Sequence, residues 1–361
     1  MSLEQRLKAQ IAASGPITVA QYMTQCLHDP RDGYYATRPA LGEGGDFITA
    51  PLVSQMFGEL LGLWAAETWS RLGRPARVLL VEAGPGDGAL MNDALRAARL
   101  EPAFLAAAEL YLIESSPVLR AVQAERLGPG PLAPRWIDSL ADLPADAPIL
   151  LIANELLDCL PARQFVRTDR GWSERMVGLD AQGALAFGLS PRPLEAIMAT
   201  ALPDADLGAV VELSPAQEAF ASDLGDRIAG QGGAALLIDY GRDQPGVGDT
   251  LQALRAHRKQ SPLEAPGEAD LTVHADFPAV AAAARAAGAT APPLLTQGEF
   301  LMRLGMGARA QALAAARPDR ADSLHRQLAR LTAPDQMGTL FKVLAVHAPS
   351  DPPPPGFEEG R

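Results

Sequence analysis

The chain has 361 residues, a formal net charge of -12 and two cysteines, Cys26 and Cys159. The length predicts one main domain with a sizeable addition. The acidic net charge argues against a basic nucleic-acid-binding face. Two cysteines are too few for a disulfide framework or a four-thiolate metal site, and we expect no metal. No apolar run approaches the roughly 18 residues of a membrane span, so we expect no membrane insertion and a reducing, cytoplasmic location.

Residues 1–75 are predicted to form a helical cap followed by a lid loop. Apolar residues recur at helical spacing on both sides of a Gly-Pro break at residues 15–16. The Gly, Pro and Asp content over residues 29–45 indicates a loop, and Asp46 and Phe47 follow it, just before an amphipathic helix. We expect Asp46 and Phe47 to belong to a lid over a ligand, although a plain surface loop would have the same composition.

Residues 76–241 alternate between strand-like and helix-like segments, which is typical of βαβ units in a parallel sheet. Residues 164–189 interrupt this pattern with two antiparallel strand candidates. We therefore predict an α/β fold, a Rossmann-like core with a mostly parallel sheet and helices on both faces. The predicted core strands are residues 78–81, 110–113, 135–137, 148–153 and 234–238.

The rest of the chain is predicted to add to this core. Residues 242–334 contain loop signals followed by helical patterns, and we expect a substrate-facing insertion. Residues 335–349 end in an apolar run that returns to the sheet as its last strand. The Pro-rich and charged residues 350–361 are predicted to be a disordered tail.

A glycine-rich turn follows the first core strand. Gly84, Gly86 and Gly88 alternate with other residues, among them Pro85, and Glu82 stands at the end of the strand. Glycines here allow positive φ angles and a close approach of the backbone to a ligand at the start of a helix. The turn formally satisfies G-x-G-x-x-G/A, so both a nicotinamide dinucleotide and S-adenosylmethionine are candidate ligands.

Acidic residues near this turn favour S-adenosylmethionine. Glu82 could hold the ammonium of the methionine moiety, although a helix N-terminus alone would also favour an anion there. Glu114 ends the second strand, where its two oxygens suit the two ribose hydroxyls. Ser115 and Asp138, at the ends of the second and third strands, are expected beside the cofactor.

The candidate methyl-acceptor residues end two other strands. Asn154 and Glu155 follow the fourth strand and Asp239 follows the fifth, so all three should converge on one crevice. Methyl transfer to an amine or guanidinium requires loss of a proton, so we expect a carboxylate near the methyl group. The segment NELLDCLP lacks a Pro-Pro-aromatic run, and its acids suit a guanidinium, which carboxylates bind in a fork geometry. Asp158 in this segment could equally be only a turn residue.

Several ordered blocks resemble the MidA family of S-adenosylmethionine-dependent methyltransferases over nearly the whole chain. They include GDFITAPLVSQMFGELLG from Gly45, LVEAGPGDGALMND from Leu80, NELLDCLP from Asn154, PGEADLT from Pro266, QGEFLMRLG from Gln297 and MGTLFKVLA from Met337.

The resemblance implies a methyltransferase core that binds S-adenosylmethionine. It also implies a protein arginine methyltransferase that acts on the quinone-site subunit of respiratory complex I and supports its assembly, in the mitochondrial matrix for eukaryotic members. Departures such as Asp87 in place of Arg spare the three glycines and Glu82. A methyltransferase fold that acts only as an assembly chaperone, and a small-molecule methyltransferase, remain alternatives.

Overall fold

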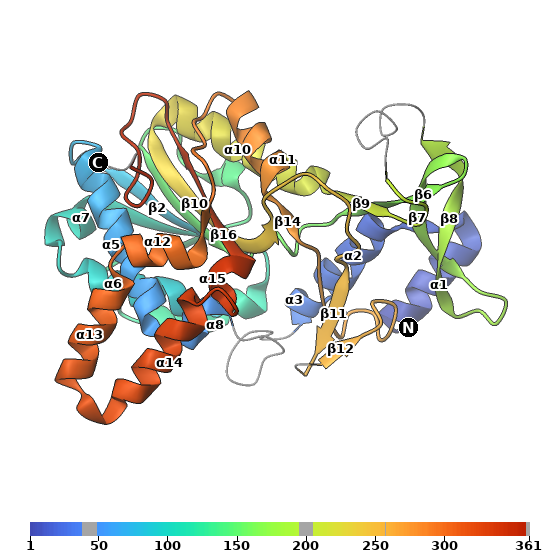
Figure 1. Ribbon diagram of the computed structural model, residues 1–361, viewed down its shortest axis with the longest axis horizontal. Coiled ribbons are helices and arrows are strands. Elements are labelled where there is room, and N and C mark those ends of the chain that lie inside the picture. Colours follow the sequence, from blue (N-terminus) through green and yellow to red (C-terminus); the bar gives the residue numbers. More distant parts are fainter. Residues whose placement is uncertain (38–48, 195–204, 257, 359–361) are drawn as a thin grey trace.

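A larger and a smaller lobe make up the protein (Figure 1). The computed structural model describes residues 1–37, 49–194, 205–256 and 258–358. The larger lobe holds the predicted parallel sheet, and the smaller lobe joins the N-terminal helices to antiparallel strands from the middle of the chain.

The larger lobe is built on a sheet with the order β15-β16-β10-β5-β2-β3-β4, and β14 pairs with the end of β10. Strands β10, β5, β2, β3 and β4 run parallel, whereas β16 is antiparallel to β10 and β15 is antiparallel to β16. Every residue of β2 and β5 is buried, as expected for strands covered on both faces. The bounds are β2 Val78–Ala83, β3 Ala108–Ile113, β4 Arg135–Ile137, β5 Ile149–Asn154, β10 Gly233–Arg242, β14 Ala275–Asp276, β15 Leu295–Thr296 and β16 Phe341–His347.

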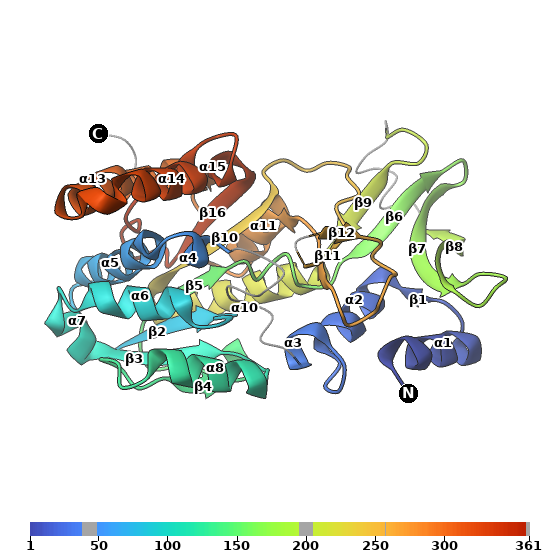
Figure 2. The same cartoon turned by 90° about the horizontal axis from the view of Figure 1, so that it is seen from below.

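Helices cover both faces of this sheet, which confirms the predicted Rossmann-like α/β core. Alternate residues of β2 face opposite ways: Leu80 packs with α5 and α6, and Leu79 packs with α10 and α11. The helices α13 and α14 form a further layer outside α5 (Figure 2). The bounds are α4 Ala50–Val53, α5 Gln55–Arg71, α6 Ala89–Ala98, α7 Pro102–Ala107, α8 Pro117–Leu127, η1 Leu140–Asp142, α10 Pro215–Gln231, α11 Phe277–Ala286, α12 Gln297–Arg303, α13 Met306–Ala316, η2 Pro318–Arg320, α14 Ala321–Thr332 and α15 Met337–Leu340.

In the described residues, the smaller lobe contains two sheets and three helices. One sheet has the order β1-β7-β6-β9 with β8 on β7, and the other has the order β12-β11-β13. Their shared core includes Leu7, Tyr22, Val177 and Leu271. The bounds are α1 Leu3–Ser14, β1 Ile17–Thr18, α2 Val19–His28, α3 Tyr34–Thr37, β6 Arg163–Thr168, β7 Gly171–Leu179, β8 Leu185–Leu194, β9 Val210–Leu213, β11 Gln252–Arg255, β12 Arg258–Gln260 and β13 Asp270–Thr272.

The smaller lobe changes the predicted division of the chain. The helices α1 and α2 pack against β7 and β13 within this lobe, whereas α5, predicted as part of the N-terminal cap, packs against α6 in the core. The predicted insertion is also divided: β11, β12 and β13 belong to the smaller lobe, and α12 to α14 pack on the larger one. Residues far apart in sequence therefore build each lobe.

The C-terminal residues up to 358 pack against the larger lobe, which contradicts the predicted disordered tail for these residues. Phe357 is buried, and its ring lies 5.7 Å from that of Phe300. Arg303 donates a hydrogen bond to the Gly356 carbonyl at 2.8 Å. Burial of the Phe357 side chain stabilises this segment, although its Pro-rich and charged composition predicted disorder.

Candidate functional site

A cavity of about 500 Å³ lies at the carboxyl ends of β2 and β5. The sheet order reverses between these two parallel neighbours, since β3 and β4 extend the sheet from β2 while β10 extends it from β5. Crevices at such switch points bind ligands in open α/β sheets. Nine of the predicted site residues line the cavity: Glu82, Gly84, Pro85, Gly86, Glu114, Ser115, Asp138, Asn154 and Glu155.

The glycine turn forms one wall of the cavity. Gly84, Gly86 and Gly88 have φ angles of +67°, +55° and +80°, which L side chains rarely adopt. Gly88 caps α6 and does not line the cavity, so it shapes the turn. Asp87 accepts a hydrogen bond from the Ala89 amide at 3.0 Å and pairs with an arginine of α8, so its negative charge is compensated locally.

Glu82 brings a buried carboxylate to this wall. Its side chain is 2% exposed, and its Oε2 atom accepts no hydrogen bond from a described residue. Burial, with a smaller contribution from the Asp87 carboxylate, raises the pKa of Glu82 to about 8. An unpaired buried carboxylate oxygen is costly, so this atom suits a cationic ligand group such as an ammonium.

Glu114 is held at the neighbouring strand end by two donors. Its Oε1 atom accepts from the Ser116 amide at 2.7 Å, and Gln123 donates to Oε2 at 3.2 Å. Gln123 also donates to the Gly86 carbonyl at 2.8 Å, so one amide ties the carboxylate to the glycine turn. Burial is the main cause that raises the pKa of Glu114. Each fixed oxygen keeps a lone pair that can accept a ligand hydroxyl.

Asn154 and Glu155 lie at the opposite side of the cavity. Glu155 has a φ angle of +54°, and its Oε1 atom accepts from the Ala50 amide at 3.1 Å and from the Asn154 amide group at 2.9 Å. Burial is the largest cause that raises the pKa of Glu155 to about 8, and the Asp158 and Asp270 carboxylates add to it. The Asn154 Oδ1 atom is buried and accepts no hydrogen bond from a described residue.

Asp239 lies outside the cavity, which contradicts the prediction that it faces the methyl acceptor. It is fully buried, and its Oδ2 atom accepts from the Leu157 amide at 2.9 Å and the Asp158 amide at 3.1 Å. Its Oδ1 atom accepts from the Tyr240 amide at 2.8 Å. Since backbone amides occupy both oxygens, Asp239 holds the turn that carries Asp158.

The smaller lobe supplies cavity residues that were not among the predicted cofactor-binding or catalytic residues. The Tyr35 hydroxyl donates to Asp270 Oδ1 at 2.8 Å and lies 3.0 Å from Cys159 Sγ. Cys159 in turn donates to Asp158 Oδ1 at 3.2 Å. The His28 ring stacks on Tyr35 with 6.0 Å between ring centroids. Asp270 lies in the family-like block PGEADLT, and its position beside Tyr35 in one cavity depends on contacts between distant segments.

Three carboxylates therefore gather at one end of the cavity. Glu155 and Asp158 follow β5, and Asp270 comes from β13 of the smaller lobe. Burial is the leading cause that raises the pKa of both Glu155 and Asp158. Among the described lining residues there is no lysine or arginine, so this cluster of acids suits a cationic guest.

Two predicted residues, Asp46 and Phe47, lie outside the described residues. Within the described ranges, no group of three or more His, Cys, Asp or Glu side chains could hold a metal ion. None of the helices in the described part of the chain combines the length and apolar character of a membrane-spanning helix.

Comparison with known proteins identifies the family. Residues 60–294 match the sequence model of the family described as "Putative S-adenosyl-L-methionine-dependent methyltransferase". The chain belongs to this family. The matched residues include both walls of the cavity, and the membership confirms the predicted resemblance and the predicted S-adenosylmethionine cofactor.

Curated relatives in this family cover nearly the whole chain. The protein arginine methyltransferase NDUFAF7 of Danio rerio, a mitochondrial protein, is 36% identical over 96% of this chain and 86% of its own length. The Homo sapiens protein of the same name is 35% identical over 94% of this chain and 82% of its own.

A solved structure in the family extends the comparison to the fold. A Burkholderia thailandensis protein bound to S-adenosyl-homocysteine is 31% identical, with a TM-score of 0.86, and the match covers 99% of this chain and 95% of that one. The protein is therefore an S-adenosylmethionine-dependent methyltransferase, and the competing nicotinamide dinucleotide hypothesis is wrong.

Proposed function

We propose that the protein is a protein arginine methyltransferase whose acceptor guanidinium enters the carboxylate end of the cavity. The main support for this proposal is that Glu155, Asp158 and Asp270 line the same cavity as the glycine turn. A guanidinium stays protonated in water, and carboxylates bind its planar fork of N–H donors. The names of the curated relatives support the same acceptor.

The opposite end of the cavity is proposed to hold the cofactor, which supplies a methyl group on a positively charged sulfur. Glu82 offers its unpaired oxygen to the ammonium, and Glu114 offers both oxygens to ribose hydroxyls. Gly84 and Gly86 bring the backbone close to the ligand, while Ser115 and Asp138 complete this wall. These residues fit the cofactor because a buried carboxylate without a donor is stabilised by a cationic group.

Glu155 is proposed to take the proton that the guanidinium loses. Its Oε1 atom is fixed by the Ala50 amide and the Asn154 amide group, so the carboxylate has one orientation. Its pKa of about 8 makes it a stronger base than an exposed carboxylate. Tyr35 keeps Asp270 in place by a 2.8 Å hydrogen bond, and the Asn154 Oδ1 atom can accept from a guanidinium N–H.

The proposed macromolecular substrate is the quinone-site subunit of respiratory complex I. The family resemblance implies this subunit and a role in complex assembly, and the 36% identity to the NDUFAF7 protein over 96% of the chain supports it. We propose a cytoplasmic location for a bacterial chain and the mitochondrial matrix for a eukaryotic one, following the mitochondrial relatives.

A methyl-transfer assay with the Glu155→Gln variant tests the enzyme proposal. Wild-type protein is expected to transfer labelled methyl from S-adenosylmethionine to an arginine peptide, and not to the matched lysine peptide. Glu155→Gln should lower kcat by about 100-fold or more, since it loses the general base, while cofactor affinity changes less than about threefold. Glu125→Gln, on the exposed surface of α8, is the matched control.

Three results would contradict the proposal. Equal activity of Glu155→Gln and wild type would show that Glu155 is not the general base. Transfer only to small molecules would favour the small-molecule alternative. Absence of transfer to any acceptor, with cofactor and partner still bound, would favour the assembly chaperone.

A further inference from the structure

A second cavity of about 440 Å³ lies at the junction of the two lobes. We call it the junction cavity. Tyr240 and Phe341 line it from the main sheet, and Met337 and Leu340 line it from α15. Lys259 on β12 lines it from the smaller lobe. Figure 1 shows β12 and α15 on the facing sides of the two lobes.

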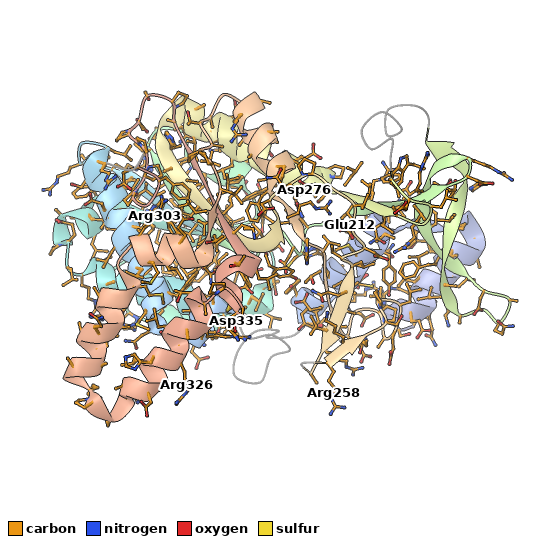
Figure 3. The ribbon with its side chains drawn as sticks, viewed as in Figure 1. Glu212, Arg258, Asp276, Arg303, Arg326 and Asp335 are labelled. Atoms are coloured by element: carbon orange, nitrogen blue, oxygen red, sulfur yellow. The ribbon has the colours of Figure 1, made fainter. Side chains whose placement is uncertain are left out.

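One basic side chain from each lobe lines the junction cavity. Lys259 and Arg330 line it, and Arg258 on β12 and Arg326 on α14 lie at the same edge of the molecule (Figure 3). Within the described residues, Arg258, Lys259 and Arg326 form no ion pair, and Arg330 donates to the neutral Gln336 side chain at 2.7 Å. Asp335 is the acidic side chain among the described lining residues.

This local charge is opposite to that of the whole chain. The chain carries a net charge of -12, and Lys259 is one of its few lysines. Cations that lack an acidic partner favour an anionic ligand through local electrostatic complementarity. The basic edge therefore does not follow from the overall composition.

The interior of the junction cavity is aromatic. The Tyr240 ring meets the rings of His274 and Phe341 edge-on, with 5.5 Å between centroids in each pair. Burial, the Arg242 guanidinium and two lysine ammonium groups lower the pKa of His274, so its ring is neutral near pH 7. An apolar floor with cations at the edge suits a short carboxylate side chain and the backbone that carries it.

Tyr240 connects the junction cavity to the catalytic cavity. It directly follows Asp239, which holds the amides of Leu157 and Asp158. Burial and then the Asp158 and Asp239 carboxylates raise the pKa of Tyr240, so Asp158, a catalytic-cavity residue, lies within electrostatic reach of the Tyr240 hydroxyl. Tyr240 therefore lines the junction cavity and interacts with an acid of the first cavity.

We propose that the junction cavity binds an acidic side chain of the methylated protein, near the arginine that enters the catalytic cavity. Lys259 and Arg330 contact the carboxylate, and Arg258 and Arg326 attract the acidic segment. With the basic junction cavity beside the acidic acceptor end of the first cavity, the enzyme would prefer an arginine that has an acidic residue near it in the substrate. This inference rests on the proposed arginine methyltransferase function.

Peptide kinetics with the full chain test this inference. Two synthetic peptides each contain one arginine. In the glutamate peptide this arginine has glutamates on both sides, and in the glutamine peptide it has glutamines at the same positions. The Lys259→Gln/Arg330→Gln double variant should raise KM for the glutamate peptide roughly tenfold, with kcat within about twofold, because partly exposed ion pairs each contribute modestly. KM for the glutamine peptide should change by less than about twofold.

The matched control is Lys8→Gln/Arg99→Gln, which removes the same two charges from α1 and from the end of α6. Equal KM changes for both peptides, or none for either, would overturn the inference. The inference would also be overturned if inorganic phosphate bound the wild-type protein but not the double variant while KM for both peptides stayed unchanged. In that case the cavity would be an anion site unrelated to the substrate.

A binding measurement separates this inference from the proposed function. Fluorescence anisotropy of the same labelled peptides is recorded with S-adenosyl-homocysteine present. If the wild-type protein methylates neither arginine peptide, the proposed function fails. The carboxylate site would still be supported if the double variant bound the glutamate peptide more weakly than wild type and bound the glutamine peptide equally well. Unchanged binding of the glutamate peptide by the double variant would overturn the carboxylate site.

Discussion

Glu82 places a carboxylate where the ligand-free protein cannot stabilise its charge. Burial and Asp87 raise its pKa to about 8, so the folded chain keeps a proton on Glu82 that an unfolded chain has lost above about pH 4.5. The folded state then binds more protons than the unfolded state between these two pH values, so the contribution of Glu82 to stability falls as pH rises through this window.

Glu82→Gln is therefore expected to stabilise the ligand-free protein at pH 8 and to weaken cofactor binding. The free energy of unfolding in urea should increase by about 1–3 kcal/mol at pH 8 and change little at pH 4.5, because glutamine carries no charge to bury. Calorimetric titration with S-adenosyl-homocysteine should show lower affinity. A variant that is less stable at pH 8 would show that Glu82 has an unrecognised partner in the folded chain.

Glu114→Ala tests the proposed ribose contact. The substitution removes two acceptor oxygens, so binding of S-adenosyl-homocysteine should weaken by roughly 1–3 kcal/mol in the same calorimetric assay. Glu125→Ala on the exposed face of α8 is the control. Unchanged affinity in Glu114→Ala would remove this residue from the cofactor site.

The sequence indicated the cavity residues of the proposed cofactor wall more completely than those of the proposed acceptor wall. Glu82, Glu114 and the glycine turn are local features, since each stands at the end of an apolar run. Tyr35 and Asp270 are 235 positions apart, and only the packing of the smaller lobe brings them to one hydrogen bond. Asp239 was predicted to follow a strand, but it lies inside β10, which continues to Arg242, and it accepts hydrogen bonds from three backbone amides outside the cavity.

At the scale of elements, close packing of α5 on α6 fixes the helix that begins at the glycine turn. A Cβ atom on Gly62 would lie 2.2 Å from the Ala94 carbonyl oxygen, so the two helices approach closely at this point. Backbone atoms cannot give way as a flexible side chain can.

Gly62→Ala should therefore destabilise the protein and disturb the cofactor wall. We expect the free energy of unfolding to fall by about 2–4 kcal/mol, with weaker S-adenosyl-homocysteine binding. Gly230→Ala, in α10 with no atom within 4 Å of the added Cβ, should instead be neutral or stabilise by up to about 1 kcal/mol. Similar unfolding curves for the two variants would contradict the packing argument.

The parallel core strands were predicted from the sequence, and the short strands of the smaller lobe were not. The strand Arg135–Ile137 has the predicted bounds, and the other four predicted core strands overlap β2, β3, β5 and β10. β1, β12 and β13 have only two or three residues each, so they depend on their pairing: β1 pairs with the distant β7, and β12 and β13 both pair with β11. The anchoring of the C-terminal residues likewise depends on the distant Phe300 ring.

At the scale of the whole molecule, the cavity joins a wall of the larger lobe, proposed to bind the cofactor, to proposed acceptor residues from both lobes. Asp270 on β13 is the carboxylate that the smaller lobe contributes. The sequence divided the chain into consecutive segments, whereas the fold combines α2, α3 and β13 around the acceptor end. Such combinations of distant segments are not encoded in a local pattern.

Asp270→Asn should impair acceptor binding and leave cofactor binding intact. We expect kcat/KM for the arginine peptide to fall by about 10- to 100-fold, because a charge-assisted hydrogen bond to the guanidinium is lost. The affinity for S-adenosyl-homocysteine should change by less than about twofold. Asp226→Asn on the exposed side of α10 is the control. Loss of cofactor affinity in Asp270→Asn would place Asp270 in the cofactor site instead.

Mass spectrometry of the complex I quinone-site subunit tests the central claim most directly. The subunit is purified from cells that carry either the wild-type chain or Glu155→Gln at equal abundance. Arginine methyltransferase activity at this cavity predicts a methylated arginine with the wild-type chain and none with the variant. The same methylation state in both cell lines, whether present or absent, would contradict it.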